Sequence, residues 1–200
     1  MKVLVVVDMQ NDFIDGSLGT PEAKAIVPKV VEKIRNVDRD TLVLLTKDTH
    51  GPDYLETLEG KILPVEHCIE GTPGWSINND ISHAADYEPR GMRYSDKKII
   101  KSRIIKHTFG SDRLGKLLND LNSYKDKITE VEFVGVCTDI CVISNALMAR
   151  QLLPDIAISV DANCCAGSTV EKHYAALSVM ESCQINVVDN DMSAGLGIYE

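Results

Sequence analysis

The chain lacks a hydrophobic run long enough to cross a membrane, and it lacks an excess of positive charge. A transmembrane helix needs about 20 consecutive apolar residues, and Asp8 ends the first apolar run too early for the apolar region of a signal peptide. The formal net charge of −9 argues against nucleic-acid binding as the main role. These absences predict a cytoplasmic protein with neither a membrane nor a nucleic acid as partner.

The chain also lacks a C-x-x-C pair, so its cysteines do not resemble a zinc ribbon or finger. The 6 cysteines lie at positions 68, 137, 141, 164, 165 and 183. In a cytoplasmic chain, reduced thiols are expected rather than disulfides. With 200 residues, 44% hydrophobic and 26% charged, the chain can form one α/β domain with a sizeable core.

Short runs rich in Val and Ile alternate with helical patterns along the chain. The runs lie at residues 2–7, 41–45, 103–105, 131–136, 156–160 and 185–188, and the helical patterns at 23–35, 112–121, 139–153 and 169–182. Nearly continuous apolar runs are typical of strands covered on both faces. The alternation predicts a three-layer, doubly wound α/β sheet of about six mainly parallel strands with helices on both faces. We expect residues 1–200 to form a single domain, with a long functional connection around residues 47–101.

Chemically capable side chains follow four of the predicted strands. Asp8 follows the first strand, Asp48 and His50 the second, Lys106 the third and Cys141 the fourth. Open α/β sheets bind their ligands beyond the carboxyl ends of the strands. We therefore expect these side chains to meet at one edge of the sheet.

Cys141 lies where the fourth strand is expected to give way to a helix. The positive end of the helix dipole favours a thiolate there, and the free N–H groups of the first turn can hold an oxyanion. Asp8 could accept the thiol proton, and Lys106 could stabilise the resulting anion. Structural alternatives are a small core residue for Cys141, a turn cap for Asp8 and a solvated surface charge for Lys106. The expected convergence of all three favours a cysteine hydrolase.

Asp48, His50 and His67 form a second candidate group, one that could bind a cation. Residues two apart in an extended segment point the same way, so Asp48 and His50 can grip one ion. A carboxylate and two imidazoles suit zinc, iron or manganese and leave open positions for water or substrate. Glu59 or Glu56 could add a fourth ligand, although all of these could instead be solvated loop residues.

Five segments match a family pattern in its order and cover nearly the whole chain. They are VDMQNDF at 7–13, TKDTH at 46–50, HCIEGTPG at 67–74, KHTFGS at 106–111 and GVCTDICV at 135–142. With these segments the chain resembles the isochorismatase-like cysteine hydrolases, and within them the nicotinamidase (pyrazinamidase) branch. The resemblance implies the isochorismatase-like fold and a hydrolase that converts nicotinamide to nicotinate and ammonia through a thioester.

The resemblance also implies roles for individual residues. Cys141 would be the nucleophile, Asp8 the general base and Lys106 the third catalytic residue. The backbone N–H groups of Cys137 and Cys141 would form the oxyanion hole, often with a cis peptide just before it, here Val136–Cys137.

A divalent metal ion is implied as cofactor, with Asp48, His50 and His67 as its ligands. Zn²⁺ is expected first, with Fe²⁺ and Mn²⁺ as alternatives, and the ion would orient the substrate through its pyridine nitrogen. Phe13 matches a ring that lines the substrate pocket. The partner would be a small amide, and a homo-oligomer is expected because relatives often form dimers or tetramers.

Some positions depart from the family pattern. Pro64 stands where a tryptophan is common, so Trp75 is the candidate to stack on the substrate, and Glu59 is the preferred substitute for a missing metal-binding histidine. Lys101 is a minor rival to Lys106 for the catalytic amine. The alternatives are a hydrolase of another small amide, a carbamoyl compound or a vinyl ether, and a catalytically silent binding module.

Overall fold

The computed structural model describes residues 1–38, 40–86, 103–123 and 127–189. In these residues six strands form one sheet in the order β3-β2-β1-β4-β5-β6, and every neighbouring pair is parallel. The strands are β1 (Lys2–Val7), β2 (Thr41–Asp48), β3 (Arg103–Lys106), β4 (Glu130–Val136), β5 (Ala157–Ala166) and β6 (Asn186–Val188). The predicted α/β sheet is confirmed, with parallel pairing throughout rather than in most strands.

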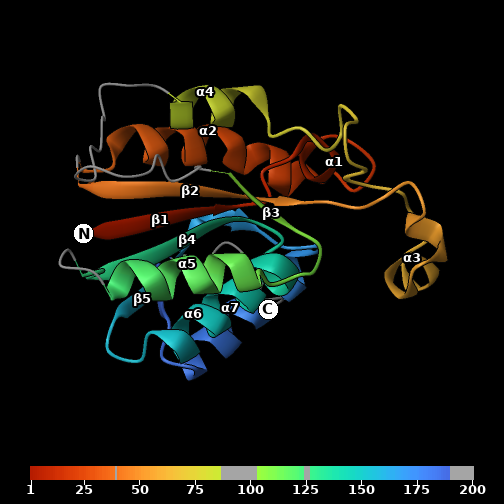
Figure 1. Cartoon of the computed structure of the whole chain (residues 1–200). Coiled ribbons are helices and arrows are strands. Elements are labelled where there is room, and N and C mark those ends of the chain that lie inside the picture. The colour runs from red at the N-terminus through yellow and green to blue at the C-terminus, as the bar shows by residue number, and fades with distance from the viewer. Residues whose placement is uncertain (39, 87–102, 124–126, 190–200) are drawn as a thin grey trace, which may run out of the picture.

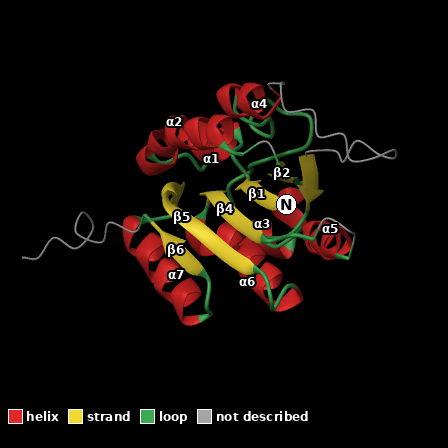
Figure 2. Ribbon diagram, turned by 90° about the vertical axis from the view of Figure 1, so that its left-hand side faces the viewer, coloured by secondary structure: helices red, strands yellow, loops and turns green. Residues whose placement is uncertain are grey.

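Helices cover both faces of the sheet (Figures 1 and 2). One face carries α1 (Asn11–Ile14), α2 (Pro21–Asn36) and α4 (Asn79–Asp86), and the other carries α5 (Asp112–Asn122), α6 (Ile143–Leu152) and α7 (Val170–Ser182). Along β1, Val3 and Val5 join the core beneath α5, α6 and α7, whereas Leu4 and Val6 join the core beneath α2. A strand with apolar residues on both sides is thus buried on both faces, which confirms the three-layer arrangement.

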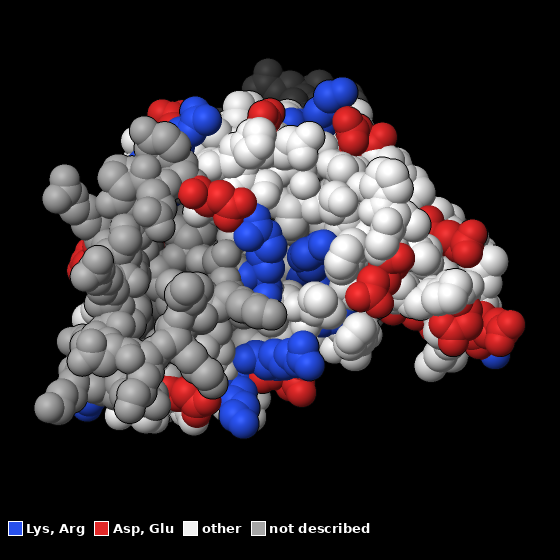
Figure 3. All heavy atoms as spheres, turned by 45° about the horizontal axis from the view of Figure 1, so that its top comes forward, with Lys and Arg blue, Asp and Glu red and all other residues white. Residues whose placement is uncertain are grey.

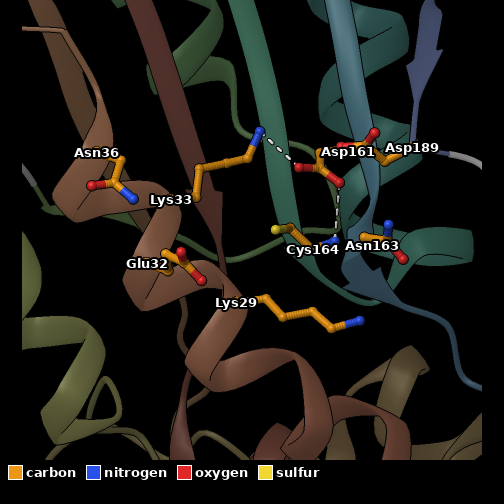
Figure 4. Close-up of a pocket in the computed structure, with 8 residues that line it drawn as sticks. All are labelled: Lys29, Glu32, Lys33, Asn36, Asp161, Asn163, Cys164 and Asp189. Carbon is orange, nitrogen blue, oxygen red and sulfur yellow. Dashed lines mark hydrogen bonds and ion pairs between the residues drawn. The ribbon is translucent and has the colours of Figure 1, made fainter.

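Apolar packing and an ion-pair network both fix α2 to the sheet. Ile26 and Val30 of this helix lie in the core beneath it. Nζ of Lys33 lies 2.6 Å from a Glu132 oxygen on β4. It also lies 2.7 Å from an Asp161 oxygen on β5, a contact that Figure 4 shows. Burial alone would lower the pKa of Lys33, but the two carboxylates raise it above its usual value. The network therefore holds one helix against two neighbouring strands.

The region after β4 differs from its prediction. A five-residue π-helical segment, η2 (Thr138–Val142), comes first, and α6 begins only after it. Cys141 therefore lies inside a π-helical turn rather than in the first turn of an α-helix. π-helical turns of this kind are frequent at functional sites.

The long connection after β2 contains short helices that were not predicted. They are the 3₁₀ turn η1 (Tyr54–Glu56), α3 (Leu58–Ile62) and α4. In Figure 1, α3 lies at one end of the molecule, away from the sheet. Lys101, the rival to Lys106, lies outside the described residues.

On the face that Figure 3 shows, Lys and Arg side chains lie close to Asp and Glu side chains. Among the helices formed by the described residues, none combines the length and the apolar character that a membrane crossing requires.

Candidate active site at the carboxyl ends of the strands

The order of the strands fixes where a site can form. From β1 the chain adds β2 and then β3 on one side, and it later adds β4, β5 and β6 on the other side. β1 and β4 are thus neighbours at the point where the strand order reverses, the position at which open α/β sheets bind ligands. Asp8 follows β1 there, and Cys141 follows β4.

Lys106 lies at the centre of the buried groups at this position. Its Nζ is 2.7 Å from Oδ2 of Asp8, 3.1 Å from Oδ1 of Asp48 and 3.4 Å from Sγ of Cys141. The residues are almost completely buried, with exposed fractions of 0% for Asp8, 3% for Asp48, 3% for Lys106 and 4% for Cys141. The structure therefore brings together the thiol, the carboxylate and the amine that the sequence singled out.

The electrostatics of this thiol cluster (Asp8, Lys106 and Cys141) set its protonation. Burial and the Asp8 carboxylate raise the pKa of Cys141 well above its usual value, and Lys106 only partly opposes this. The expected lowering by a helix dipole was wrong, because desolvation of a buried sulfur outweighs it. Burial also raises the pKa of Asp8, against the pull of Lys106. Burial alone would lower the pKa of Lys106, but Asp8 and Cys141 raise it, so the amine stays charged beside a thiol.

Backbone geometry holds Asp8 in place. Its φ of 48° lies in the left-handed region, where the chain leaves the sheet after Val7. The Thr46 hydroxyl donates to Oδ1 of Asp8 at 2.7 Å and accepts from the Asp8 N–H at 3.1 Å. Across the sheet, Gly135 has a φ of +116°, and a Cβ there would lie 2.1 Å from the Val7 carbonyl oxygen. Glycine thus lets β4 pass close to the end of β1 at Val7, directly before Asp8.

The turn between β4 and Cys141 has the predicted backbone feature. The Val136–Cys137 peptide bond is cis. The roles of the Cys137 and Cys141 N–H groups as an oxyanion hole stay a prediction.

Asp48, His50 and His67 are brought together beside the thiol cluster. Their ligand atoms all lie within 4.8 Å of one another. Oδ2 of Asp48 is 3.1 Å from Nε2 of His50 and 3.8 Å from Nε2 of His67. Two ligands of a tetrahedral zinc ion, each about 2 Å from it, are about 3.3 Å apart. The donor set and its spacing therefore fit a divalent ion.

Glu59 of α3 lies beside these three residues, and the four together are called the metal cluster (Asp48, His50, His67 and Glu59) below. Its Oε1 lies 3.8 Å from Nε2 of His50 and 4.0 Å from Nε2 of His67. Burial would raise the pKa of Asp48, but His50 and Lys106 hold it below its usual value. Two carboxylates and two imidazoles thus converge on one space.

Neighbouring groups orient the two histidines. Nδ1 of His67 lies 2.8 Å from the Val65 carbonyl, so this nitrogen carries the proton and Nε2 is free to bind a metal. The Tyr54 ring packs against His50 and His67, with centroids 4.7 and 5.0 Å apart. The Phe13 ring lies 5.5 Å from that of His67, which places this predicted substrate contact beside the metal cluster.

Gln10 positions Asp48, and sequence reasoning gave it no role. Its Oε1 accepts from the Asp48 N–H at 2.7 Å, and its Nε2 donates to the carbonyls of Asp48 and Trp75, both at 2.9 Å. Trp75 itself donates from Nε1 to Thr49 at 2.8 Å, and Nζ of Lys47 lies 3.0 Å from its ring centroid. One face of Trp75 is thus covered, so the predicted stacking on a substrate would need the other face.

Thr46, Tyr54 and Gln10 are the supporting residues that sequence reasoning missed. Gln10 and Thr46 fall inside the matched segments at 7–13 and 46–50, which was the available indication. Tyr54 falls inside the long connection around residues 47–101, which was expected to be functional without any indication of this residue.

A parallel α/β sheet with a thiol, a carboxylate and an amine at its switch point has the geometry of a thiol-dependent hydrolase. The Isochorismatase domain family matches residues 2–192, and the chain belongs to this family of hydrolases.

Curated relatives and solved structures agree with this assignment. The chain is 30% identical to a nicotinamidase of Schizosaccharomyces pombe, over 92% of this chain and 91% of that protein. It is 28% identical to a nicotinamidase/pyrazinamidase of Mycobacterium tuberculosis, over 94% and 98%. A pyrazinamidase of Pyrococcus horikoshii, solved in complex with zinc, superimposes with a TM-score of 0.70 at 25% identity, over 94% and 98%.

Proposed function

We propose that the protein is a metal-dependent cysteine amidohydrolase that converts nicotinamide to nicotinate and ammonia. The observation that carries the proposal is the position of Lys106, whose ammonium contacts both the Asp8 carboxylate and the Cys141 sulfur. The names of the relatives support an amide of this class as substrate.

The first half of the reaction uses the buried charges of the thiol cluster. Asp8 accepts the thiol proton of Cys141, and the sulfur attacks the carbonyl carbon of the amide. The ammonium of Lys106 balances one negative charge, whether the carboxylate or the sulfur holds it. The net charge of the buried cluster is therefore unchanged by the proton transfer, which limits its cost in a medium of low dielectric constant. The backbone N–H groups of Cys137 and Cys141 would hold the oxyanion, each donor contributing roughly 3 kcal/mol.

The second half regenerates the thiol. Asp8 returns its proton to the amide nitrogen, the C–N bond breaks, and ammonia leaves a thioester on Cys141. A water molecule then attacks the thioester while Asp8 accepts one of its protons. The C–S bond breaks, the proton on Asp8 returns to sulfur, and the product leaves as nicotinic acid, which loses its remaining proton to solvent to give nicotinate.

Asp48, His50 and His67 would hold a divalent ion, Zn²⁺ first and Fe²⁺ or Mn²⁺ as alternatives, with Glu59 as the fourth ligand. When bound, this ion would supply a Lewis-acidic position for the pyridine nitrogen of the substrate. Phe13, beside His67, would then contact the substrate ring.

A second candidate function is the hydrolysis of another small amide, a carbamoyl compound or a vinyl ether. It is favoured by Pro64, where a tryptophan is common in nicotinamidases, and by the covered face of Trp75. Ammonia release from nicotinamide and from a panel of small amides would separate the two. No ammonia from nicotinamide would overturn the first proposal, and a metal-loaded protein inactive on the whole panel would point to a binding module.

We also retain the proposal of a homo-oligomer. Light scattering of the purified protein would test it, and a monomeric mass would contradict it.

A further inference from the structure

Asn145 lies one helical turn after Cys141 and joins two segments of the chain, each of which carries a group of the thiol cluster. Its Nδ2 donates to the Cys141 carbonyl at 2.8 Å and to the Phe109 carbonyl at 3.1 Å. Its Oδ1 accepts from the Ser111 N–H at 3.0 Å. The residue is completely buried, at 0% exposure. One side-chain amide thus bonds three backbone groups, one beside the nucleophile and two in the loop after β3.

The same loop is tied to the catalytic amine. Nζ of Lys106 donates to the Thr108 carbonyl at 3.2 Å, one residue before the carbonyl that Asn145 holds. Nζ also contacts Sγ of Cys141 at 3.4 Å. The contacts close a ring that runs from the Cys141 backbone through Asn145, the loop and Lys106 back to the Cys141 sulfur.

We propose that Asn145 is a positioning residue, which fixes the separation of Cys141 Sγ and Lys106 Nζ by cross-linking the turn of one to the loop of the other. The proposal rests on the proposed function for its kinetic consequence, whereas the contact itself can be probed without a substrate. A misplacement of about 1 Å at reacting groups can cost about 10²-fold in rate. Loss of the cross-link is therefore expected to affect the chemical step more than substrate binding.

Two substitutions at position 145 and one control separate positioning from stability. Asn145→Asp keeps the shape and an acceptor for the Ser111 N–H, but a carboxylate cannot donate to the two carbonyls. Asn145→Ala removes all three bonds. Ser111→Ala is the control in the same loop, because it removes only the hydroxyl that accepts from the Leu114 N–H and caps α5. The backbone bond from Ser111 to Asn145 remains.

The first readout is steady-state hydrolysis of nicotinamide by the zinc-loaded protein. We expect both Asn145 variants to lose at least about tenfold in kcat, with KM within about twofold and unchanged zinc content. Ser111→Ala should lower the melting temperature and leave kcat unchanged.

The second readout is the pH profile of iodoacetamide alkylation at Cys141, followed by peptide mass spectrometry. Asp8, Lys106, Asp48 and Cys137 are the titratable groups that influence this thiol. If the sulfur moves away from Lys106, its pKa rises, so both Asn145 variants should be alkylated at higher pH than the wild type. Ser111→Ala should keep the wild-type profile.

Two results would overturn the proposal: folded Asn145 variants with wild-type kcat and alkylation profile, or changes that Ser111→Ala reproduces at a matched loss of melting temperature. If Asn145→Ala does not fold, Asn145→Asp decides. If the wild type releases no ammonia from nicotinamide, the proposed function fails, and the alkylation profiles alone decide the role of Asn145.

Discussion

The thiol cluster and the metal cluster share one edge of the sheet but are built in different ways. Asp8 directly follows β1, Lys106 ends β3 and Cys141 lies in η2 after β4, whereas in the metal cluster only Asp48 belongs to a strand. The thiol cluster already contains its cation, since the Lys106 ammonium contacts the other groups at 2.7 to 3.4 Å. In the metal cluster, histidine nitrogens and carboxylate oxygens stand 3.1 to 4.0 Å apart around a space that suits an ion.

The difference teaches that the thiol cluster has its compensating cation within the protein, whereas the side chains of the metal cluster surround a space that a divalent ion would fit. Asp48 connects them, because one of its oxygens faces Lys106 and the other faces His50. Substitutions in one cluster should therefore leave the other largely intact as long as Asp48 is kept.

The largest effect is expected from Cys141→Ala. Without the nucleophile, nicotinamide turnover should fall at least about 10³-fold, because no thioester can form. Metal content should equal that of the wild type, since the four metal-cluster side chains are untouched. Ammonia release and elemental analysis measure the two. Cys183→Ala, at an exposed cysteine, is the control and should keep full activity. Comparable turnover by Cys141→Ala would refute the mechanism.

His67→Ala tests whether the thiol cluster stays intact when the metal cluster is disrupted. Loss of one imidazole should release most of the metal and lower turnover by about 10²-fold. Cys141 should still be alkylated, because the thiol cluster keeps its own cation, although loss of an ion beside Asp48 should shift the reaction toward higher pH. His83→Ala on α4 is the matched histidine control. Full metal content in His67→Ala would show that this histidine is not a ligand.

The pH dependence tests the role of Asp8 in the thiol cluster, when it is measured at a pH where the metal stays bound. Asp8 must be ionised to accept the thiol proton, and burial raises its pKa. The rate constant kcat/KM should therefore fall about tenfold per unit as pH drops through a value above the ordinary Asp pKa of about 3.9. The Thr46 hydroxyl lowers the pKa of Asp8, so in Thr46→Val the fall of kcat/KM at low pH should begin at a higher pH. If the fall begins at the wild-type pH in Thr46→Val, Asp8 is not the base.

The smallest effect is expected from Glu59→Gln. A neutral amide in place of the carboxylate should weaken zinc binding by only about three- to tenfold, because the other three ligands remain. Competition with a fluorescent chelator measures the affinity. Glu56→Gln, on η1, is the control for a nearby charge and should change nothing. Equal affinities for Glu59→Gln and wild type would leave the ion with three protein ligands.

The strand ends explain why so much of the site could be predicted. Parallel strands bring Asp8, Asp48, Lys106 and Cys141 to one edge regardless of their distance along the chain, and apolar runs locate such strands well. The observed strands differ from the predicted ones mainly by continuing further, as in β2, which was predicted to end at residue 45 and ends at Asp48.

Other features depend on contacts that no local pattern encodes. The turn of Cys141 is π-helical, and its pKa follows burial rather than a helix dipole, because the surrounding core is known only once the chain has folded. Gln10 and Asn145 act through backbone groups far away in sequence, and any amide side chain could make such bonds. The short helix α3, which carries Glu59, has too few residues to show a clear period.

The side chain of Gln10 has a consequence for the shape of the sheet. It offers Asp48 an acceptor and a donor, the same pair of bonds that a peptide unit of an adjacent strand would offer. β1 can therefore turn aside after Val7 while β2 continues to be paired as far as Asp48. Only an amide side chain can make both bonds at position 10. A Glu carboxylate has no N–H to donate, so the Asp48 carbonyl would lose its hydrogen-bond partner. The Gln10 side chain thus takes the place of a peptide unit of β1 beside Asp48, which leaves space for the Asp8 carboxylate at this edge of the sheet.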